Sequence, residues 1–110
     1  METNAFPVSV FKRAWGTVYE LFNVRGKFTV AIEVIPAGKL IGRHYHNNSK
    51  EIEIILDGMP LVNNNKATPG DIFIWNPTEI HEYNNVQSQS EAFILTISIP
   101  SFDIEDEIFI

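Results

Sequence analysis

The stretch GRHYHNNSKEIEIILDG, from Gly42 to Gly58, decides how this sequence is interpreted. It contains two of the three histidines of the chain, His44 and His46, and a glutamate, Glu51, five positions further on. The two histidines are separated by one residue, and on a β-strand such residues point to the same face. Two imidazoles on one face can share a metal ion, and a nearby carboxylate supplies negative charge to the same cation.

The spacing between His46 and Glu51 is an odd number of residues, which on one unbroken strand would place the carboxylate on the opposite face. The residues Asn47–Lys50 read NNSK, and a turn or bulge there would reset the register. A histidine pair on a strand is also common on solvated faces that bind nothing. The pair alone therefore does not establish a metal site.

The rest of the chain shows the two-residue period of β-strands rather than the 3.6-residue period of helices. Four segments rich in β-branched and aromatic residues are predicted strands: Lys27–Ile35, Glu51–Leu56, Asp71–Trp75 and Glu91–Ile99. The segment Phe11–Phe22 is compatible with strand or other extended structure, and Asn63–Asn65 indicates a tight hairpin tip. Turns separate these segments, so we expect an all-β antiparallel sandwich or barrel.

The composition is that of an ordinary globular domain and excludes several function classes. The chain has 110 residues, 45% of them hydrophobic, and we expect a single domain over residues 1–110. Its net charge is −6 and its eight basic residues are scattered, so we expect no nucleic-acid binding. The absence of cysteine excludes disulfides, thiolate metal sites and cysteine nucleophiles.

The ends of the chain give weaker indications. The N-terminal stretch Met1–Trp15 has no signal pattern and no apolar run approaches 18 residues, so we expect a cytoplasmic protein without a membrane partner. The acidic run Asp103–Glu107 is predicted to be a solvated tail. The apolar end Ile108–Ile110 needs cover, either in an interface or on its own barrel.

The wider spacing around the opening stretch resembles the first motif of the cupin superfamily. Gly38 is followed after five residues by His44-x-His46, after four more by Glu51, and after six more by Gly58. A second set resembles the second cupin motif, so that the two together span residues 38–85: Gly70, Asp71, Pro77, His81 and Asn85. This chain has Asn76 and Thr78 where that motif usually has proline and glycine. Those departures raise the question of where the turn places His81.

The resemblance implies a double-stranded β-helix, the jelly-roll or RmlC-like cupin barrel, with a divalent transition metal inside. The implied ligands are all three histidines and one glutamate: His44, His46, Glu51 and His81. Three imidazoles and one carboxylate leave two positions open on an octahedral ion, as a catalytic metal requires. These ligands do not distinguish iron, manganese, zinc, nickel and cobalt.

The flanks of the motifs resemble a narrower group within the superfamily. The segments Arg13–Phe22 and Ser101–Ile108 are similar to the two ends of cupins related to type II mannose-6-phosphate isomerase. Ala14 replaces a proline of that group. Glu82 stands where the group has an arginine after the second-motif histidine, which argues against phosphate binding at that position.

Strand parity assigns roles to residues near the implied ligands. Glu53 lies two residues after Glu51 and should share its face, which makes it a candidate general acid or base; an outward-turning bulge or a lysine partner is the alternative. Tyr83 lies two residues after His81 and should line the pocket or fill the core. Arg43 and Tyr45 should point away from the metal.

Two further residues have structural rather than chemical expectations. Asn85 ends the second motif and is predicted to close a turn. Trp15 is predicted to be a core or rim residue.

The function that these observations favour is metal-assisted isomerisation, or related chemistry, on a small sugar, sugar phosphate or uronate. A first alternative with the same ligand set is a non-haem metal dioxygenase acting on a small metabolite. A second is a cupin that binds a small ligand without catalysis. The expected partners are a small-molecule substrate and, from the family resemblance, a second copy in a homodimer.

Overall fold

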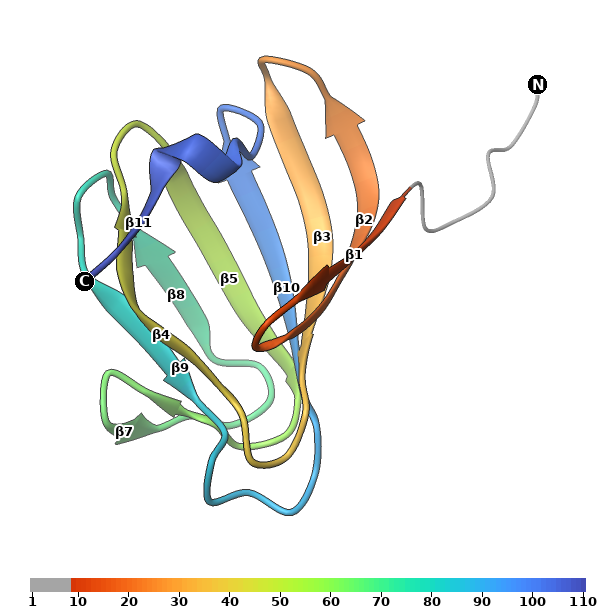
Figure 1. Ribbon diagram of the computed structural model, residues 1–110, viewed down its shortest axis with the longest axis vertical. Coiled ribbons are helices and arrows are strands. Elements are labelled where there is room, and N and C mark those ends of the chain that lie inside the picture. The colour runs from red at the N-terminus through yellow and green to blue at the C-terminus, as the bar shows by residue number, and fades with distance from the viewer. Residues whose placement is uncertain (1–8) are drawn as a thin grey trace.

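The computed structural model describes residues 9–110, in which two β-sheets face each other across the interior (Figure 1). The large sheet has the strand order β1-β2-β3-β10-β5-β8 and the small sheet β11-β4-β9-β6-β7. The bounds are β1 Ser9–Arg13, β2 Gly16–Val24, β3 Phe28–Ile35, β4 Leu40–His46, β5 Lys50–Asp57, β6 Leu61–Val62, β7 Asn65–Lys66, β8 Ile72–Trp75, β9 His81–Asn84, β10 Ala92–Ile99, the 3-10 helix η1 Ile104–Asp106 and β11 Glu107–Phe109.

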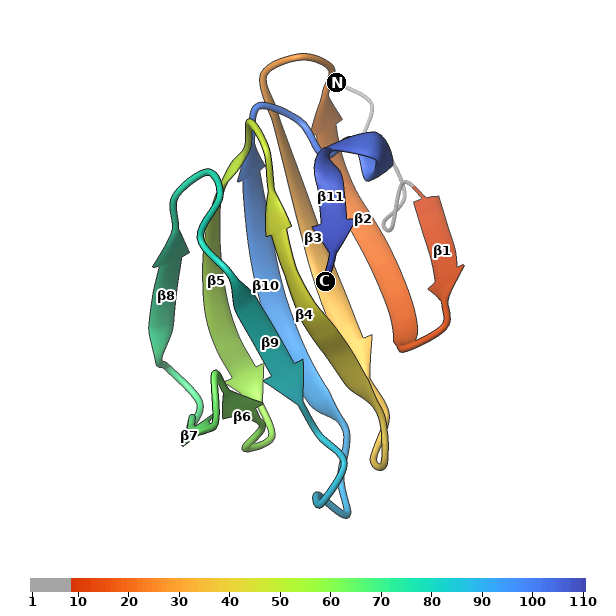
Figure 2. The same ribbon diagram turned by 60° about the vertical axis from the view of Figure 1, so that its left-hand side comes forward.

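The connections make this pair of sheets a double-stranded β-helix, as the sequence predicted. All strand pairs are antiparallel, and from β3 onward the chain alternates between the sheets except at the β6–β7 hairpin, so that β10 lies between β3 and β5 (Figure 2). The four predicted strand segments form β3, β5, β8 and β10. The ambiguous segment Phe11–Phe22 forms β1 and most of β2. No helix within residues 9–110 is long and apolar enough to cross a membrane.

The predicted hairpin tip joins β6 to β7. Asn63 and Asn64 have φ values of 47° and 67°, the left-handed conformation that asparagine tolerates in a two-residue hairpin turn. Asn85 closes a turn as predicted, because its side-chain amide donates to the backbone carbonyls of Ile35 (2.9 Å) and Ser90 (2.9 Å).

The inner faces of the strands change from apolar to polar along their length. On β10 the inner residues run Ala92, Ile94, Thr96 and Ser98, and the last three pair with Ile55, Glu53 and Glu51 of β5. The apolar end forms the core, which includes Trp15 as predicted. The polar end lines a cavity between the sheets. Sequence alternation therefore divides one interior into a packed half and a hollow half.

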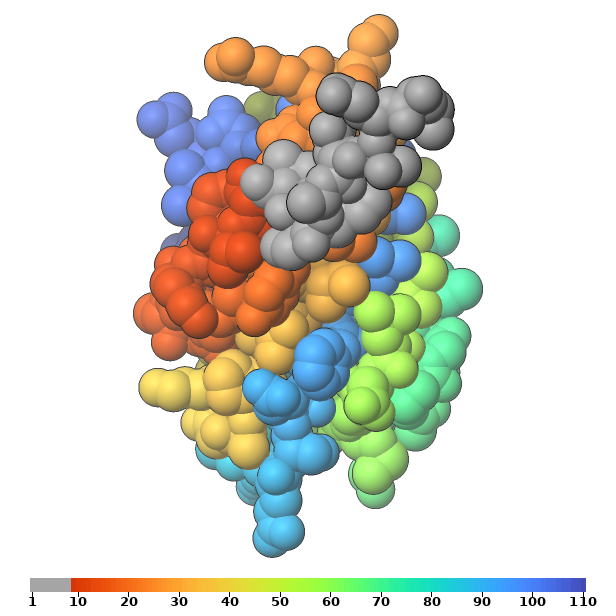
Figure 3. Space-filling model, turned by 90° about the vertical axis from the view of Figure 1, so that its right-hand side faces the viewer, coloured from red at the N-terminus to blue at the C-terminus, as the bar shows by residue number. Residues whose placement is uncertain are grey.

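The outer face of the large sheet is apolar. Strands β3, β10, β5 and β8 lie side by side across it in Figure 3. We call its central residues the outer patch: Ile32, Ile52, Ile54, Ile72, Ile74, Phe93, Leu95 and Ile97. Each is half-buried or exposed and alternates along its strand with an inward-facing residue. The patch contains no charged side chain.

The prediction of a solvated acidic tail over Asp103–Glu107 is wrong for its second half. The Asp106 side chain is 8% exposed. Its carboxylate accepts from the backbone N–H of Asn48 (2.9 Å), the Asn48 amide (3.0 Å) and the backbone N–H of Ser49 (3.1 Å). The turn after β4 leaves these donors without strand partners, and a carboxylate can accept all three.

The apolar end pairs with its own barrel through β11, while the side chains of Phe109 and Ile110 stay 47% and 63% exposed. Strand β11 pairs with β4, with Ile108 opposite Tyr45. The ring of Phe109 lies 5.1 Å from that of His44, centroid to centroid.

Candidate metal centre

A bulge in β4 brings His44 to the inside of the barrel. Ile41 pairs with Tyr83 and His44 pairs with His81, so β4 advances three residues while β9 advances two. Both Ile41 and His44 are consequently buried, although they are an odd number of residues apart. His46 follows on the same face and is buried too, whereas Arg43 is exposed, as parity predicted.

His81 reaches the same point from β9 despite the altered motif before it. Thr78 has a φ of 72°, the left-handed conformation usually left to glycine, and its backbone N–H donates to the carbonyl of His46 (2.7 Å). That bond ties the turn to the end of β4. The ring centroid of His81 lies 4.2 Å from that of His44 and 5.5 Å from that of His46. The substitutions at Asn76 and Thr78 therefore leave His81 beside the other two histidines.

Glu51 approaches from the opposite sheet. The residues Asn47–Ser49 form the turn between β4 and β5, so the odd spacing no longer sets the face. Oε1 of Glu51 lies 2.9 Å from Nε2 of His46 and 3.3 Å from Nε2 of His81. The Ser98 hydroxyl donates to Oε2 at 3.1 Å, which fixes the other oxygen.

The four side chains form a buried group that could hold a metal ion, with one ligand atom of each within 4.8 Å of the others. Nδ1 of His44 lies 2.7 Å from the Gly42 carbonyl, and Nδ1 of His81 lies 3.0 Å from the Glu79 carbonyl. Each Nδ1 therefore carries the proton, and each Nε2 presents a lone pair to the centre.

Orphaned nitrogens give an independent test of whether a metal fits. Within residues 9–110, Nε2 of His81 and both ring nitrogens of His46 are buried without a hydrogen-bond partner of good geometry. Such atoms are costly unless something else satisfies them. A divalent cation bound by His44, His46, Glu51 and His81 would satisfy the inward-facing ones, so the residues fit the ion.

The protonation states suit metal binding. Burial, together with the charge of His81, lowers the pKa of His44 to about 4, so its imidazole is neutral at pH 7. Burial alone would raise the pKa of Glu51, but its close contacts with the imidazoles of His46 and His81 lower the pKa to about 2. Burial opposes the charged form of His46 too, yet the Glu51 carboxylate raises the pKa of His46 above its usual value. A cation would replace the proton that Glu51 favours there.

A second pair of acids lies beside this group in the same cavity. The single hydroxyl of Thr96 lies 2.7 Å from Oε1 of Glu33 and 2.8 Å from Oε2 of Glu53. A hydroxyl has one proton to donate, so this geometry requires that one of the two carboxyls also carry a proton. Burial and the neighbouring charge of Glu51 raise the pKa of Glu53 to about 7. Burial and the charge of Glu53 raise the pKa of Glu33.

Glu33 was not among the residues that the sequence singled out. The signal was present, because an acid stands in the middle of the otherwise apolar strand AIEVI, Ala31–Ile35. Its parity matches that of Thr29 and Ala31, which also line the cavity.

Tyr83 belongs to both the core and the cavity lining, the two positions considered for it. It is almost fully buried, and its hydroxyl accepts a hydrogen bond from Nε1 of Trp75 (3.1 Å). Burial and the nearby Glu53 raise the pKa of Tyr83, so the hydroxyl stays neutral.

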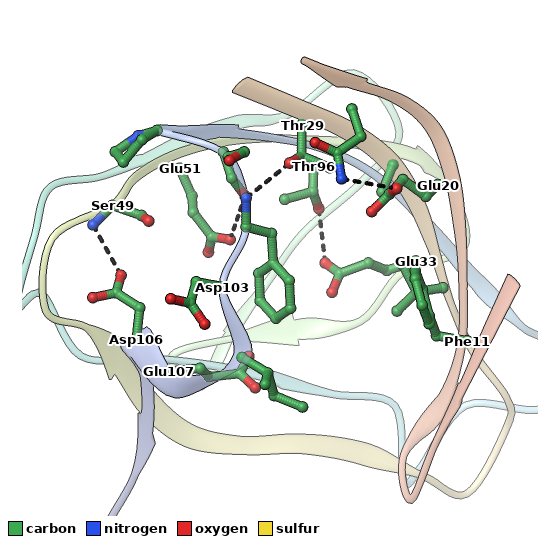
Figure 4. A pocket seen from close by; sticks show the side chains of 18 of the residues that line it. Phe11, Glu20, Thr29, Glu33, Ser49, Glu51, Thr96, Asp103, Asp106 and Glu107 are labelled. Carbon is green, nitrogen blue, oxygen red and sulfur yellow. Dashed lines mark hydrogen bonds between the residues drawn. The ribbon is translucent and has the colours of Figure 1, made fainter. Parts of the chain in front are cut away.

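The cavity has a volume of about 1100 Å³ and is lined by both sheets and by the C-terminal segment (Figure 4). Glu107, a second residue that the sequence did not single out, closes one side. Its Oε2 lies 4.0 Å from Nε2 of His44, and its Oε1 forms an ion pair with Arg13 at 2.6 Å. In the sequence it was one acid in an apparently solvated run, and no local signal distinguished it.

The comparisons with known proteins concern the fold. No protein-family model matches the chain, and no curated protein matches its sequence. Among solved structures, the capsular polysaccharide assembling protein CapF from Staphylococcus aureus matches with a TM-score of 0.78 at 14% identity, over 96% of this chain and 35% of CapF. This chain thus spans about a third of the length of CapF.

Two matching proteins are similar in length to this chain. KdgF from Halomonas sp. has a TM-score of 0.76 at 14% identity, over 94% of this chain and 99% of KdgF. Streptomyces PAC13, solved with uridine, has a TM-score of 0.74 at 16% identity, over 100% of this chain and 92% of PAC13. The folds of these neighbours are of the cupin type, and so is the fold of this chain.

Proposed function

We propose that this cupin-fold chain is a metal-dependent enzyme that isomerises, or does related chemistry on, a small sugar, sugar phosphate or uronate. The observation that carries the proposal is Glu53, a buried carboxyl that lines the same cavity as His44 and Glu51 of the four-residue group. Its Oε2 is held by Thr96, while its Oε1 lacks a hydrogen-bond partner of good geometry among the described residues. A buried acid with one unpaired oxygen beside a metal group is suited to moving a proton.

The chemistry follows from the two parts of the site. A divalent cation, when bound, would supply positive charge to adjacent carbonyl and hydroxyl oxygens of a substrate. Ionised Glu53 would then take the proton from the hydroxyl-bearing carbon next to the carbonyl. The C–H electron pair becomes the C=C bond of an enediolate, and the carbonyl π electrons move to oxygen. The hydroxyl proton then passes to the former carbonyl oxygen. The other oxygen forms the new carbonyl as the C=C electron pair takes the proton from Glu53 at the former carbonyl carbon, which completes the exchange of aldose and ketose.

Three residues support this role of Glu53. The Thr96 hydroxyl orients its carboxyl group, and Tyr83, whose hydroxyl accepts a hydrogen bond from Trp75, lines the same cavity beside it. Burial keeps the pKa of Glu53 near 7, so both its acid and its base form are accessible at neutral pH. His44, His46, Glu51 and His81 are left to hold the cation.

The experiment that tests the proposal is solvent exchange. Metal-loaded protein is incubated in D₂O with a panel of aldoses, ketoses, their phosphates and uronates, and NMR follows loss of the proton next to the carbonyl. We expect exchange with at least one compound, and about a hundredfold slower exchange with Glu53→Gln at unchanged metal content. Undiminished exchange in Glu53→Gln would remove its role, and no exchange with the whole panel would contradict the proposed activity.

The two alternatives predict different results in the same samples. A dioxygenase would consume O₂ when the iron-loaded protein meets its substrate. A binding protein without catalysis would be stabilised against heat by its ligand, with neither exchange nor O₂ consumption. PAC13 was solved with uridine, which supports a small hydroxylated ligand for this fold without identifying one for this chain.

A further inference from the structure

The cavity is lined by an excess of acids. Seven carboxyl groups line it: Glu20, Glu33, Glu51, Glu53, Asp103, Asp106 and Glu107. Three permanently charged basic residues line it: Lys12, Arg13 and Arg25. A bound divalent cation offsets two of the negative charges, so the lining remains acidic around whatever else enters.

The basic residues are poorly placed to bind an anionic group near the metal centre. Arg13 is paired with Glu107 at 2.6 Å, and Nζ of Lys12 lies 3.1 Å from the Thr17 hydroxyl. Arg25 is exposed on the turn between β2 and β3. Lys12 and Arg25 are exposed residues of β1 and of that turn, whereas Glu33 and Glu53 share the Thr96 hydroxyl beside the metal group. A phosphate or carboxylate bound at the metal would therefore meet these two carboxyl groups first.

The acids of the inner cavity can accept hydrogen bonds from a neutral ligand. Glu53 is 2% exposed, and its Oε1 lacks a partner of good geometry. Glu33 shares the Thr96 hydroxyl and lies on the same wall (Figure 4). A sugar hydroxyl can donate a hydrogen bond to such an oxygen, whereas a phosphate ester dianion or a carboxylate can only accept. The one proton of the Glu33–Glu53 pair is held at the Thr96 hydroxyl, so the pair keeps one negative charge, which would repel an anion.

We infer that the ligand of this cavity is a neutral polyhydroxylated molecule, an uncharged sugar or a nucleoside-like compound, and that sugar phosphates and uronates are excluded. The inference rests on the proposed function, because it concerns the substrate of the same site. Of the three substrate classes that the sequence favoured, the inference keeps the uncharged sugar, and it adds the nucleoside-like compound.

The test uses matched neutral and anionic compounds. Thermal shifts and titration calorimetry are measured on the metal-loaded protein with glucose, mannose, fructose and uridine, each beside its monophosphate, and with glucuronate and mannuronate. We expect at least one neutral compound to bind, and its anionic counterpart to bind about tenfold more weakly or not at all. Equal or tighter binding of the counterpart would overturn the inference, as would no binding by any neutral compound.

A charge variant tests the physical cause. Glu33→Gln combined with Glu53→Gln removes the negative charge of the pair without altering a metal ligand, and we expect the double variant to reduce the discrimination against anions by about fivefold at unchanged metal content. Glu105→Gln is the matched control, because Glu105 is exposed and does not line the cavity. Unchanged discrimination in the double variant would overturn the electrostatic cause.

The inference and the proposed function can fail separately. Anion-preferring binding with intact solvent exchange would overturn the inference and leave the activity standing. Binding of a neutral sugar as inferred, without exchange or loss of substrate, would leave the ligand class standing and remove the activity.

Discussion

The two sheets that face each other at the site carry different side chains there, and these side chains are held in different ways. The small sheet supplies the imidazoles of His44, His46 and His81, which we call the imidazole wall. The large sheet supplies the carboxyl groups of Glu33, Glu51 and Glu53, the carboxylate wall. Backbone carbonyls fix two of the imidazoles, whereas side-chain hydroxyls of β10 hold the carboxyl groups.

The difference separates metal binding from proton transfer. A backbone carbonyl fixes the tautomer of a histidine permanently, which suits a ligand. A shared hydroxyl with one proton leaves a carboxyl pair able to gain or lose a proton, which suits an acid or base. Glu51 belongs to the carboxylate wall by position and to the metal group by contact. The walls should therefore respond differently to substitution.

The largest effect is expected on the imidazole wall. His81→Ala removes one of four ligands, and we expect metal affinity to fall by at least about a hundredfold, measured by competition with a chelating dye. Tyr45→Phe is the control, because Tyr45 lies on β4 between two of the ligands and points away from them. Unchanged affinity in His81→Ala would show that the two sheets do not share one ion.

We expect the carboxylate wall to determine how the unfolding free energy of the metal-free protein depends on pH. The pKa of Glu53 is about 7 in the folded state against 4.5 as its ordinary value, so the folded state binds this proton more tightly. The contribution of this raised pKa to the unfolding free energy is fully present below about pH 4.5 and is lost as the pH rises through 7. Relative to wild type, Glu53→Gln should therefore gain on the order of 3 kcal/mol in unfolding free energy between pH 5 and 8.

The unfolding free energies of wild type and Glu53→Gln are compared as a difference, because the titration of His44 changes stability with pH in the opposite direction. Its pKa of about 4 in the folded state, below the ordinary 6.5, makes stability rise with pH between those values. Urea denaturation of both proteins across the range cancels that contribution. A pH-independent difference would mean that Glu53 is ionised in the folded state throughout.

A smaller effect is expected at the turn that joins the walls. The Asp106 carboxylate accepts three hydrogen bonds from N–H groups of Asn48 and Ser49, which lie in the turn between His46 and Glu51. Asp106→Asn keeps one acceptor oxygen and adds donors, so we expect a loss of about 2 kcal/mol in unfolding free energy. The exposed Glu105→Gln should leave stability unchanged. An equal, small effect in both variants would mean that Asp106 does not hold the turn.

The smallest effect is expected before β9, where the imidazole wall contains a strained residue. Thr78 has a φ of 72°, which costs a β-branched residue more than glycine. Thr78→Gly should stabilise the protein by about 1 kcal/mol, measured by urea denaturation. Thr68→Gly, at a turn position without positive φ, should destabilise it by a similar amount. Destabilisation by both would exclude strain at Thr78.

The sequence predicted the fold, and it predicted the imidazole wall more completely than the carboxylate wall. Strand alternation and motif spacing led to the four-residue group, because those signals are local and periodic. The partner of Glu53 was missed, since Glu33 lies on β3 and meets it only across β10. Glu107 and Asp106 were misread as solvent-exposed. Whether an acid is solvated depends on where the chain folds back, which local composition does not encode.

Metal content is the most direct test of the central claim, that the imidazole wall and Glu51 bind one ion. Elemental analysis is made on protein purified without chelators or a metal-affinity tag, and again after incubation with iron, manganese, zinc, nickel and cobalt in turn. The account predicts about one ion per chain in the wild type and background levels in His81→Ala. Background levels in the wild type with all five metals, or equal loading of His81→Ala, would contradict it.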